Sequence, residues 1–222
     1  MITKQKNYWN LRYTREKCIW GEEPSGFSKI CEKDFQDKDF RDILVVGCGY
    51  GRNAEYFNSK GYHVMGIDVS EEAIELARQR QKHVTSHCVL DYEICAIEKF
   101  SPNKKFDVIY GFNIIHLFYD SKLRHNVYSK MKEWLNPQGY CYFCAMSTKD
   151  RSYGKGKCWG EDIYESKPGR IIKYFGEISL ASDLSRYFKV EKLFLHIEIE
   201  NHGGSEHEHD LVAAICRTGR NE

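Results

Sequence analysis

Three glycines, each separated from the next by one residue, lie in ILVVGCGYGRNAEYF, residues 43–57. They are Gly47, Gly49 and Gly51. Glycines at this spacing let a backbone turn sharply and approach a ligand without Cβ clashes. The helix that should begin near Arg52 would aim its N-terminal amides at that ligand. A pyrophosphate or an amino-acid carboxylate could bind there, and the glycines alone do not decide between them.

Acidic residues follow the glycine turn at the spacing expected of further strand ends. Asp68 lies 17 residues after Gly51, where its carboxylate can accept hydrogen bonds from both hydroxyls of a ribose. Asp91 and Tyr92 follow a third apolar run, where a carboxylate can accept from an adenine amino group. The turn lacks the dinucleotide spacing Gly-x-Gly-x-x-Gly. This pattern favours S-adenosylmethionine over a dinucleotide; the alternative is a structural glycine turn in another doubly wound protein.

Histidines supply the candidates for acid–base chemistry. His202, His207 and His209 lie among acids in EIENHGGSEHEHD, and His116 follows the predicted fourth strand. The group of three could contact substrate, act as a general base, bind a metal or form a charged surface loop. His116 could act as a base, line the pocket or be structural. We assign no metal, treat all four as catalytic candidates, and expect at least one of the three to reach the acceptor pocket.

Strands and helices must alternate to position these residues. Strands are predicted at 43–48, 62–67, 86–90, 106–115 and 140–146, and helices at 121–135 and 177–187. Strand-like segments 191–200 and 210–217, joined by a short linker, should pair antiparallel. We expect one or two covering helices within residues 1–40, and a long loop at 147–170 that shapes a substrate pocket. This predicts a doubly wound α/β fold in a single domain over residues 1–222.

Composition narrows the partners and the location. The 222 residues include 33 basic and 32 acidic ones, and this balance disfavours binding to nucleic acid. No apolar run is long enough for a signal peptide or a membrane span. Nine cysteines, an odd number, indicate reduced thiols and a cytoplasmic location. Cys141 and Cys144 should face opposite sides of a strand and belong to the core. A monomer and a homodimer both remain open.

The motifs between residues 40 and 146 resemble those of the class I S-adenosylmethionine-dependent methyltransferases. VVGCGYGRNAEYF, GYHVMGIDVSEEAIELA, the acid of LDYE, KFDVIYGFNIIHLF and LNPQGYCYF follow that family's order and spacing. The resemblance implies a seven-stranded, mostly parallel sheet that ends in an antiparallel hairpin. It implies a cofactor site formed by Gly47, Cys48, Gly49 and Gly51 for the methionine part, Asp68 and Val69 for the ribose, Asp91 and Tyr92 for the adenine, and Phe112 and Asn113 beside the sulfonium. LNPQG departs from the family's usual second glycine after proline, which changes only a turn.

The N-terminal segment NYWNLRYTREKCIWGEEPS resembles the opening of tellurite- and thiopurine-type small-molecule methyltransferases. That resemblance implies a lid over the cofactor formed by Trp9, Arg12, Tyr13 and Trp20. The alternative is a docking helix whose tryptophans only pack on the sheet.

These features predict an enzyme that moves the methyl group of S-adenosylmethionine to a small intracellular acceptor by in-line displacement. YGFN at 110–113 is not the Asn/Asp-Pro-Pro-Tyr/Phe loop of nucleic-acid amine methyltransferases, and the chain has no Pro-Cys pair for pyrimidine C5 methylation. An RNA or protein methyltransferase that uses the basic segments 78–82 and 166–173 is the second hypothesis. A non-catalytic cofactor-binding protein is the third.

Overall fold

A seven-stranded sheet forms the centre of the computed structural model, which describes the backbone of residues 2–202 and 205–219 and the side chains of 5–201 and 205–219. The strand order is β3-β2-β1-β4-β5-β10-β9. The strands are β1 (Asp42–Val46), β2 (His63–Asp68), β3 (Leu90–Ile94), β4 (Phe106–Phe112), β5 (Leu135–Met146), β9 (Lys189–His202) and β10 (Ser205–Arg217). The first five are parallel, and β10 is antiparallel to both β5 and β9. The predicted doubly wound fold with its antiparallel C-terminal hairpin is confirmed.

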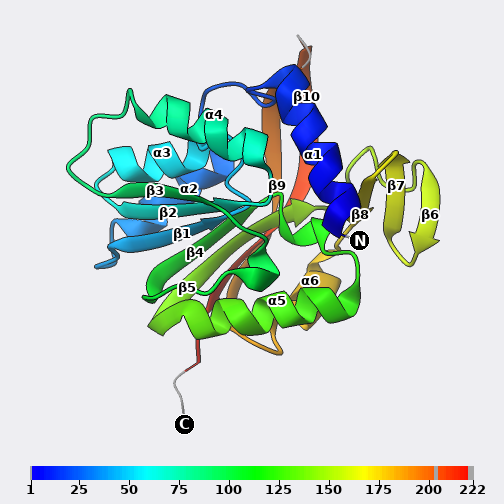
Figure 1. The fold of residues 1–222 in the computed structure, drawn as a ribbon. Coiled ribbons are helices and arrows are strands. Elements are labelled where there is room, and N and C mark those ends of the chain that lie inside the picture. The colour runs from blue at the N-terminus through cyan, green and yellow to red at the C-terminus, as the bar shows by residue number, and fades with distance from the viewer. Residues whose placement is uncertain (1, 203–204, 220–222) are drawn as a thin grey trace.

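Helices cover both faces of this sheet (Figure 1). Alternation along β4 places Tyr110 in one apolar core and Ile109 in the other. The first core is closed by α2 (Gly26–Phe35), α3 (Arg52–Ser59) and α4 (Glu71–Gln81), and the second by α5 (Ser121–Trp134) and α6 (Glu177–Leu184). Cys144 and Cys141 likewise lie in opposite cores, as predicted. No helix within the described residues is long and apolar enough to cross a membrane.

The third strand lies further along the chain than predicted. The segment 86–90 mostly precedes β3, and the parallel register places Asp68 level with Ile94. Because β3 is an edge strand, its side chains alternate between buried and exposed at Leu90, Asp91 and Tyr92. The apolar run that ends at Leu90 therefore marks the start of this strand and not its end.

The expected long loop at 147–170 is also corrected, because most of it forms a second sheet. Strands β6 (Lys157–Gly160), β7 (Ile163–Lys167) and β8 (Arg170–Lys173) pair antiparallel in that order. Every side chain of β6 is exposed. A short strand without a buried face shows no alternation of apolar and polar residues. Its sequence therefore has the polar composition of a loop and was predicted as one.

The helix α1 (Ile2–Glu16) crosses the carboxyl ends of the parallel strands, between α4 and β8 (Figure 1). The Asn10 Oδ1 atom accepts a 2.6 Å hydrogen bond from the Ser70 hydroxyl before α4. On the other side, the Gln5 amide donates to the carbonyl oxygens of Leu117 (2.9 Å) and Ile171 (3.4 Å). One or two helices were expected within residues 1–40, and two are present, α1 and α2. The helix α1 covers the end of the sheet where the glycine turn lies.

Candidate active site

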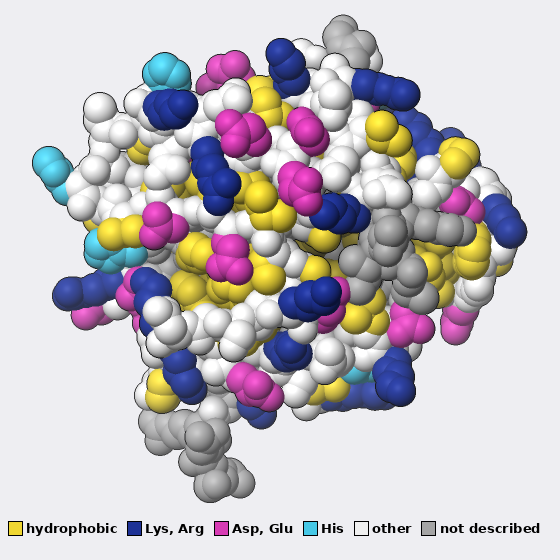
Figure 2. All heavy atoms as spheres, in the orientation of Figure 1, with side chains coloured by type: hydrophobic (Ala, Val, Ile, Leu, Met, Phe, Trp, Pro, Cys, Tyr) yellow, Lys and Arg dark blue, Asp and Glu magenta, His cyan; other side chains and the backbone are white. Residues whose placement is uncertain are grey.

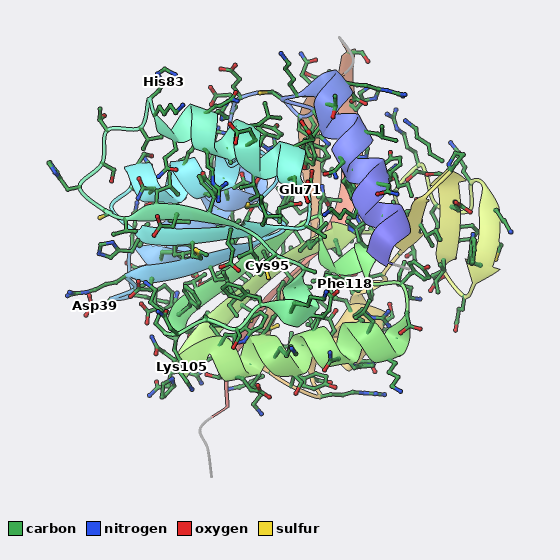
Figure 3. All side chains as sticks on the ribbon, viewed as in Figure 1. Asp39, Glu71, His83, Cys95, Lys105 and Phe118 are labelled. Atoms are coloured by element: carbon green, nitrogen blue, oxygen red, sulfur yellow. The ribbon has the colours of Figure 1, made fainter. Side chains whose placement is uncertain are left out.

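A cavity opens at the carboxyl ends of the parallel strands, beneath α1. Figure 3 labels Cys95, after β3, and Phe118, after the short helix η2 (Ile115–Leu117), on the side of the sheet that α1 crosses. The predicted residues that line the cavity are Trp9, Tyr13, Trp20, Gly47, Cys48, Gly49, Asp68, Val69, Phe112, Asn113, His116 and His209. Residues that the sequence did not indicate are Gln5, Tyr50, Arg52, Ile67, Cys95, Ala96, Ile97, Glu98, Ile114, Leu117, Phe118, Leu123, Met146, Arg170 and Glu200.

The glycine turn after β1 is shaped by close contacts that a side chain would prevent. Gly49 has a φ of +56°, and a Cβ there would lie 2.7 Å from the hydroxyl oxygen of Tyr13. Gly51 has a φ of +89° and packs on the buried Tyr92 hydroxyl, so it shapes the turn without lining the cavity. The turn therefore requires glycine both for its backbone angles and for its closeness to α1.

Asp68 at the end of β2 supports the turn and faces the cavity. Its two carboxylate oxygens accept hydrogen bonds from the backbone amides of Gly49 and Ser70, both at 2.9 Å. Burial raises the pKa of Asp68, while the amides of Ser70, Gly49 and Val69 act against that rise. Each oxygen of a carboxylate has more than one acceptor position, so Asp68 can also accept from ligand hydroxyls.

The residues predicted to contact an adenine are not at the cavity. Asp91 is exposed and is the second residue of β3, and neither it nor Tyr92 is among the described residues that line the cavity. At the carboxyl end of β3 the lining comes from Cys95, Ala96 and the short helix η1 (Ile97–Lys99). The predicted placement of Asp91 and Tyr92 is wrong because β3 continues to Ile94.

Three of the four predicted lid residues line the cavity. Trp9, Tyr13 and Trp20 do so, and the Trp20 ring stacks on Tyr50 with a centroid distance of 6.3 Å and an interplanar angle of 13°. Arg12 instead lies 5.3 Å from the centroid of the Trp20 ring and pairs with Glu16 at 3.2 Å. Arg12 therefore supports the aromatic residues and does not line the cavity.

An ion pair that the sequence did not predict fixes the lid to the sheet. Arg52 Nη2 lies 2.5 Å from a carboxylate oxygen of Glu200 on β9, and both side chains are buried. Arg52 Nη1 donates to the carbonyl oxygen of Trp20 at 2.8 Å. The position of Arg52 directly after the glycine turn was a usable signal, but its partner lies 148 residues away in sequence.

Asn113 follows β4 in a conformation that few residues other than glycine adopt. Its φ is +55°, and its backbone amide donates to the carbonyl oxygen of Cys144 at 2.9 Å. Within the described chain, its side-chain oxygen is buried and has no hydrogen-bond partner. Because an unpaired buried acceptor is costly, this oxygen fits a donor supplied by a ligand, such as an ammonium group.

His116 is held in one neutral form. Its Nδ1 accepts a hydrogen bond from the backbone amide of Met146 at 3.2 Å, which leaves the ring proton on Nε2. Burial, with the charge of Arg170 acting in the same direction, lowers the pKa of His116 to about 3. His116 can therefore donate a hydrogen bond into the cavity, and the predicted role as a base does not fit this geometry.

His209 is the member of the C-terminal histidine group that reaches the cavity. Its Nδ1 lies 3.2 Å from a carboxylate oxygen of the buried Asp150. Burial would raise the pKa of Asp150, but hydrogen bonds from His209 and Ser152 outweigh burial and lower it to about 2. A carboxylate that stays ionised beside one ring nitrogen orients the imidazole and favours the proton on that nitrogen.

His207 does not line the cavity, and the side chain of His202 is not among those the structure describes. His207 lies on the same face of β10 as His209 but contacts Arg151 at 2.7 Å and Ser205 at 2.9 Å. The side chain of His202 lies outside the described residues, as do Gly203 and Gly204. In the part of the chain that the structure describes, no group of three or more potential ligands could hold a metal ion.

Residues 43–139 match the family model described as "Methyltransferase domain". The ubiquinone biosynthesis O-methyltransferase of Pelagibacter ubique (strain HTCC1062) is 31% identical over 149 residues, which cover 64% of this chain and 55% of the relative. The corresponding protein of Rhodopseudomonas palustris (strain BisB5) is 33% identical over 73 residues, which cover 33% of this chain and 28% of the relative. The matched region thus spans about half or less of these curated relatives.

Solved structures extend the likeness of fold over nearly the whole chain. The N-methyltransferase NodS from Bradyrhizobium japonicum WM9, in complex with S-adenosyl-L-homocysteine, superposes with a TM-score of 0.69 at 17% identity, covering 98% of this chain and 100% of NodS. The 1,6-didemethyltoxoflavin-N1-methyltransferase of Burkholderia thailandensis gives a TM-score of 0.67 at 18% identity, covering 98% and 85% of the two chains. At these identities the likeness establishes the fold.

Proposed function

We propose that this chain, whose residues 43–139 match a methyltransferase domain, is a class I S-adenosylmethionine-dependent methyltransferase that transfers the methyl group of its cofactor to a small-molecule acceptor. One observation carries the proposal. One cavity is lined by Asp68 and the glycine turn and also by His209, whose Nδ1 is hydrogen-bonded to Asp150 outside the lining. The same space therefore holds groups suited to a nucleoside and a group suited to removing a proton.

Residues of the chain fit the cofactor at three points. Asp68 has acceptor positions for ribose hydroxyls. The unpaired side-chain oxygen of Asn113 suits a positively charged amino group. Cys95 and Ala96, with the short helix that follows, supply the apolar edge where an adenine would lie, in place of the sequence-predicted Asp91 and Tyr92.

Bound S-adenosylmethionine supplies an already activated methyl group, whose bond to sulfur breaks as the acceptor bonds to carbon and whose electron pair stays on sulfur. The chain must then align the acceptor, exclude water and remove any proton that the acceptor loses. With Nδ1 hydrogen-bonded to Asp150, His209 carries its proton-accepting lone pair on Nε2. His116, whose Nε2 carries a proton, can orient the acceptor by donating to it.

The segments that cover the cavity favour a small molecule as the methyl acceptor. Gln5 bridges η2 and β8 across one side, and the aromatic residues of α1 close another. On the face shown in Figure 2, basic and acidic side chains are interspersed and form no continuous basic surface. A polyanion would find little long-range attraction on that face.

Isotopically labelled S-adenosylmethionine, incubated with the protein and a cell extract that is then fractionated by size, tests the proposal. We expect label in the small-molecule fraction, and none with the His209→Ala variant above background. Label confined to RNA or protein would replace the proposed acceptor class. Binding of S-adenosylhomocysteine without transfer to any fraction would show a cofactor-binding protein without this activity.

A further inference from the structure

Arg170 is a cation at the cavity for which the structure records no hydrogen-bond or ion-pair partner among the described residues. It begins β8 and lines the cavity together with His116 and His209. No hydrogen bond or ion pair joins its guanidinium to any residue that the structure describes, and its Nε is buried without an acceptor. A guanidinium carries five N–H donors, and burying even the one on Nε without an acceptor is costly.

Other arginines in the structure at buried or partly buried positions have acceptors. Arg52 pairs with Glu200 at 2.5 Å, and Arg124 pairs with Asp183 at 2.6 Å. Arg80 pairs with Glu55 at 2.8 Å. The rule that buried charges are compensated therefore holds elsewhere in this fold, and Arg170 departs from it at the cavity.

Asp150, the carboxylate whose charge acts on Arg170, already has hydrogen-bond donors at both oxygens. One oxygen of Asp150 accepts from Ser152, at 2.8 Å from its backbone amide, and the other accepts from His209 and from the Asp210 amide at 3.1 Å. Burial lowers the pKa of Arg170, whereas the charge of Asp150 acts in the opposite direction. An arginine remains charged in proteins, so the positive charge persists and faces the cavity.

We propose that Arg170 binds a carboxylate carried by the methyl acceptor. This inference rests on the proposed function, because it names the class of molecule that the same cavity accepts. A carboxylate matches the planar fork of a guanidinium through two parallel hydrogen bonds. Its single negative charge is balanced by Arg170, whereas a phosphate dianion would need a second cation. The other arginine that lines the cavity, Arg52, is already paired with Glu200.

The position of Arg170 connects this binding to catalysis. The carboxylate would lie beside the Nε2 proton of His116 and near the His209–Asp150 pair, so one end of the acceptor is fixed where a base is available. Gln5 holds the backbone of Ile171, the next residue, against α1 and η2. Arg170 would therefore determine which acceptors the enzyme methylates. The second sheet, β6–β8, would hold Arg170 in position.

The experiment divides a small-molecule extract before the reaction. An anion exchanger at pH 7 separates retained anions from the flow-through, and a further low-pH elution separates carboxylates from phosphates. Each pool is incubated with labelled S-adenosylmethionine and the full-length protein. We expect label in the carboxylate pool, and a loss of about ten- to a hundredfold in kcat/KM for that pool with Arg170→Gln. Arg170→Lys, which keeps the charge without the fork, should retain an intermediate rate.

Controls separate this inference from the proposed function. Lys167→Gln changes an exposed cation three residues away on β7 and should leave the rate unchanged. Calorimetry with S-adenosylhomocysteine should give equal affinity in Arg170→Gln and the wild type, which excludes misfolding. Absence of label in every pool would refute the proposed methyl transfer. Label found only in the flow-through or the phosphate pool, or an unchanged rate with Arg170→Gln, would overturn the role of Arg170 while leaving the function intact.

Discussion

Asp68 has two tasks at the residue scale, because it supports the glycine turn and faces the cavity. Replacing it with alanine removes acceptors from the Gly49 and Ser70 amides as well as from any ribose. We expect Asp68→Ala to lose affinity for S-adenosylhomocysteine by tenfold or more and to lower the free energy of unfolding by about 1–3 kcal/mol. Asp68→Asn, which keeps one acceptor oxygen, should be the milder variant. Calorimetry and urea denaturation measure the two effects, and unchanged affinity in the alanine variant would remove Asp68 from cofactor binding.

His209 and His207 form a matched pair for testing the base. They share a face of β10, but only His209 lines the cavity and contacts Asp150. We expect His209→Ala to lower kcat by about 10²–10⁴-fold, the usual contribution of a general base, with unchanged affinity for S-adenosylhomocysteine. His207→Ala should keep the wild-type kcat. Turnover is measured on the labelled small-molecule pool, and equal rates in the two variants would leave His209 as a lining residue only.

At the scale of elements, some helices and strands could be predicted from the sequence and others could not. Glycine turns and buried strands such as β1 and β4 are encoded locally, so their positions were predicted to within a few residues. The register of β3 was missed because an edge strand has no continuous apolar run. The β6–β8 sheet was missed because its strands are only four or five residues long and β6 is exposed throughout. The position of Arg170 at the cavity was missed with it. The Arg52–Glu200 pair joins α3 to β9, and no local pattern reports such a contact.

The N-terminal helices must be tested separately, because they have different roles. Phe27, Cys31 and Phe35 of α2 are fully buried in a core of the main sheet, so a chain starting near Lys38 should unfold and cannot report on the lid. A chain starting at Lys17 lacks only α1. We expect its far-ultraviolet circular dichroism to fall only by the contribution of the 15 residues of α1. We expect it to lose affinity for S-adenosylhomocysteine together with turnover, since Trp9 and Tyr13 are gone. Wild-type affinity in that chain would reduce α1 to a packing element.

At the scale of the whole molecule, the buried His116 couples stability to pH. Burial lowers its pKa to about 3 in the folded protein, whereas an unfolded histidine titrates near about 6.5. Between these values the unfolded chain binds a proton that the folded chain does not, so stability must fall as pH falls from about 6.5 towards 3. The slope from this one group is at most about 1.4 kcal/mol per pH unit.

The variant His116→Asn isolates that slope, because its amide oxygen can still accept from the Met146 backbone amide but does not titrate. We expect urea denaturation at pH 7 and pH 5 to show that the wild type loses about 2 kcal/mol more than the variant does over this interval. Other titrating groups are common to both proteins and cancel in the difference. Equal losses would mean that His116 takes up a proton in the folded state, and the assignment of its Nε2 as a fixed donor to the acceptor would then be wrong.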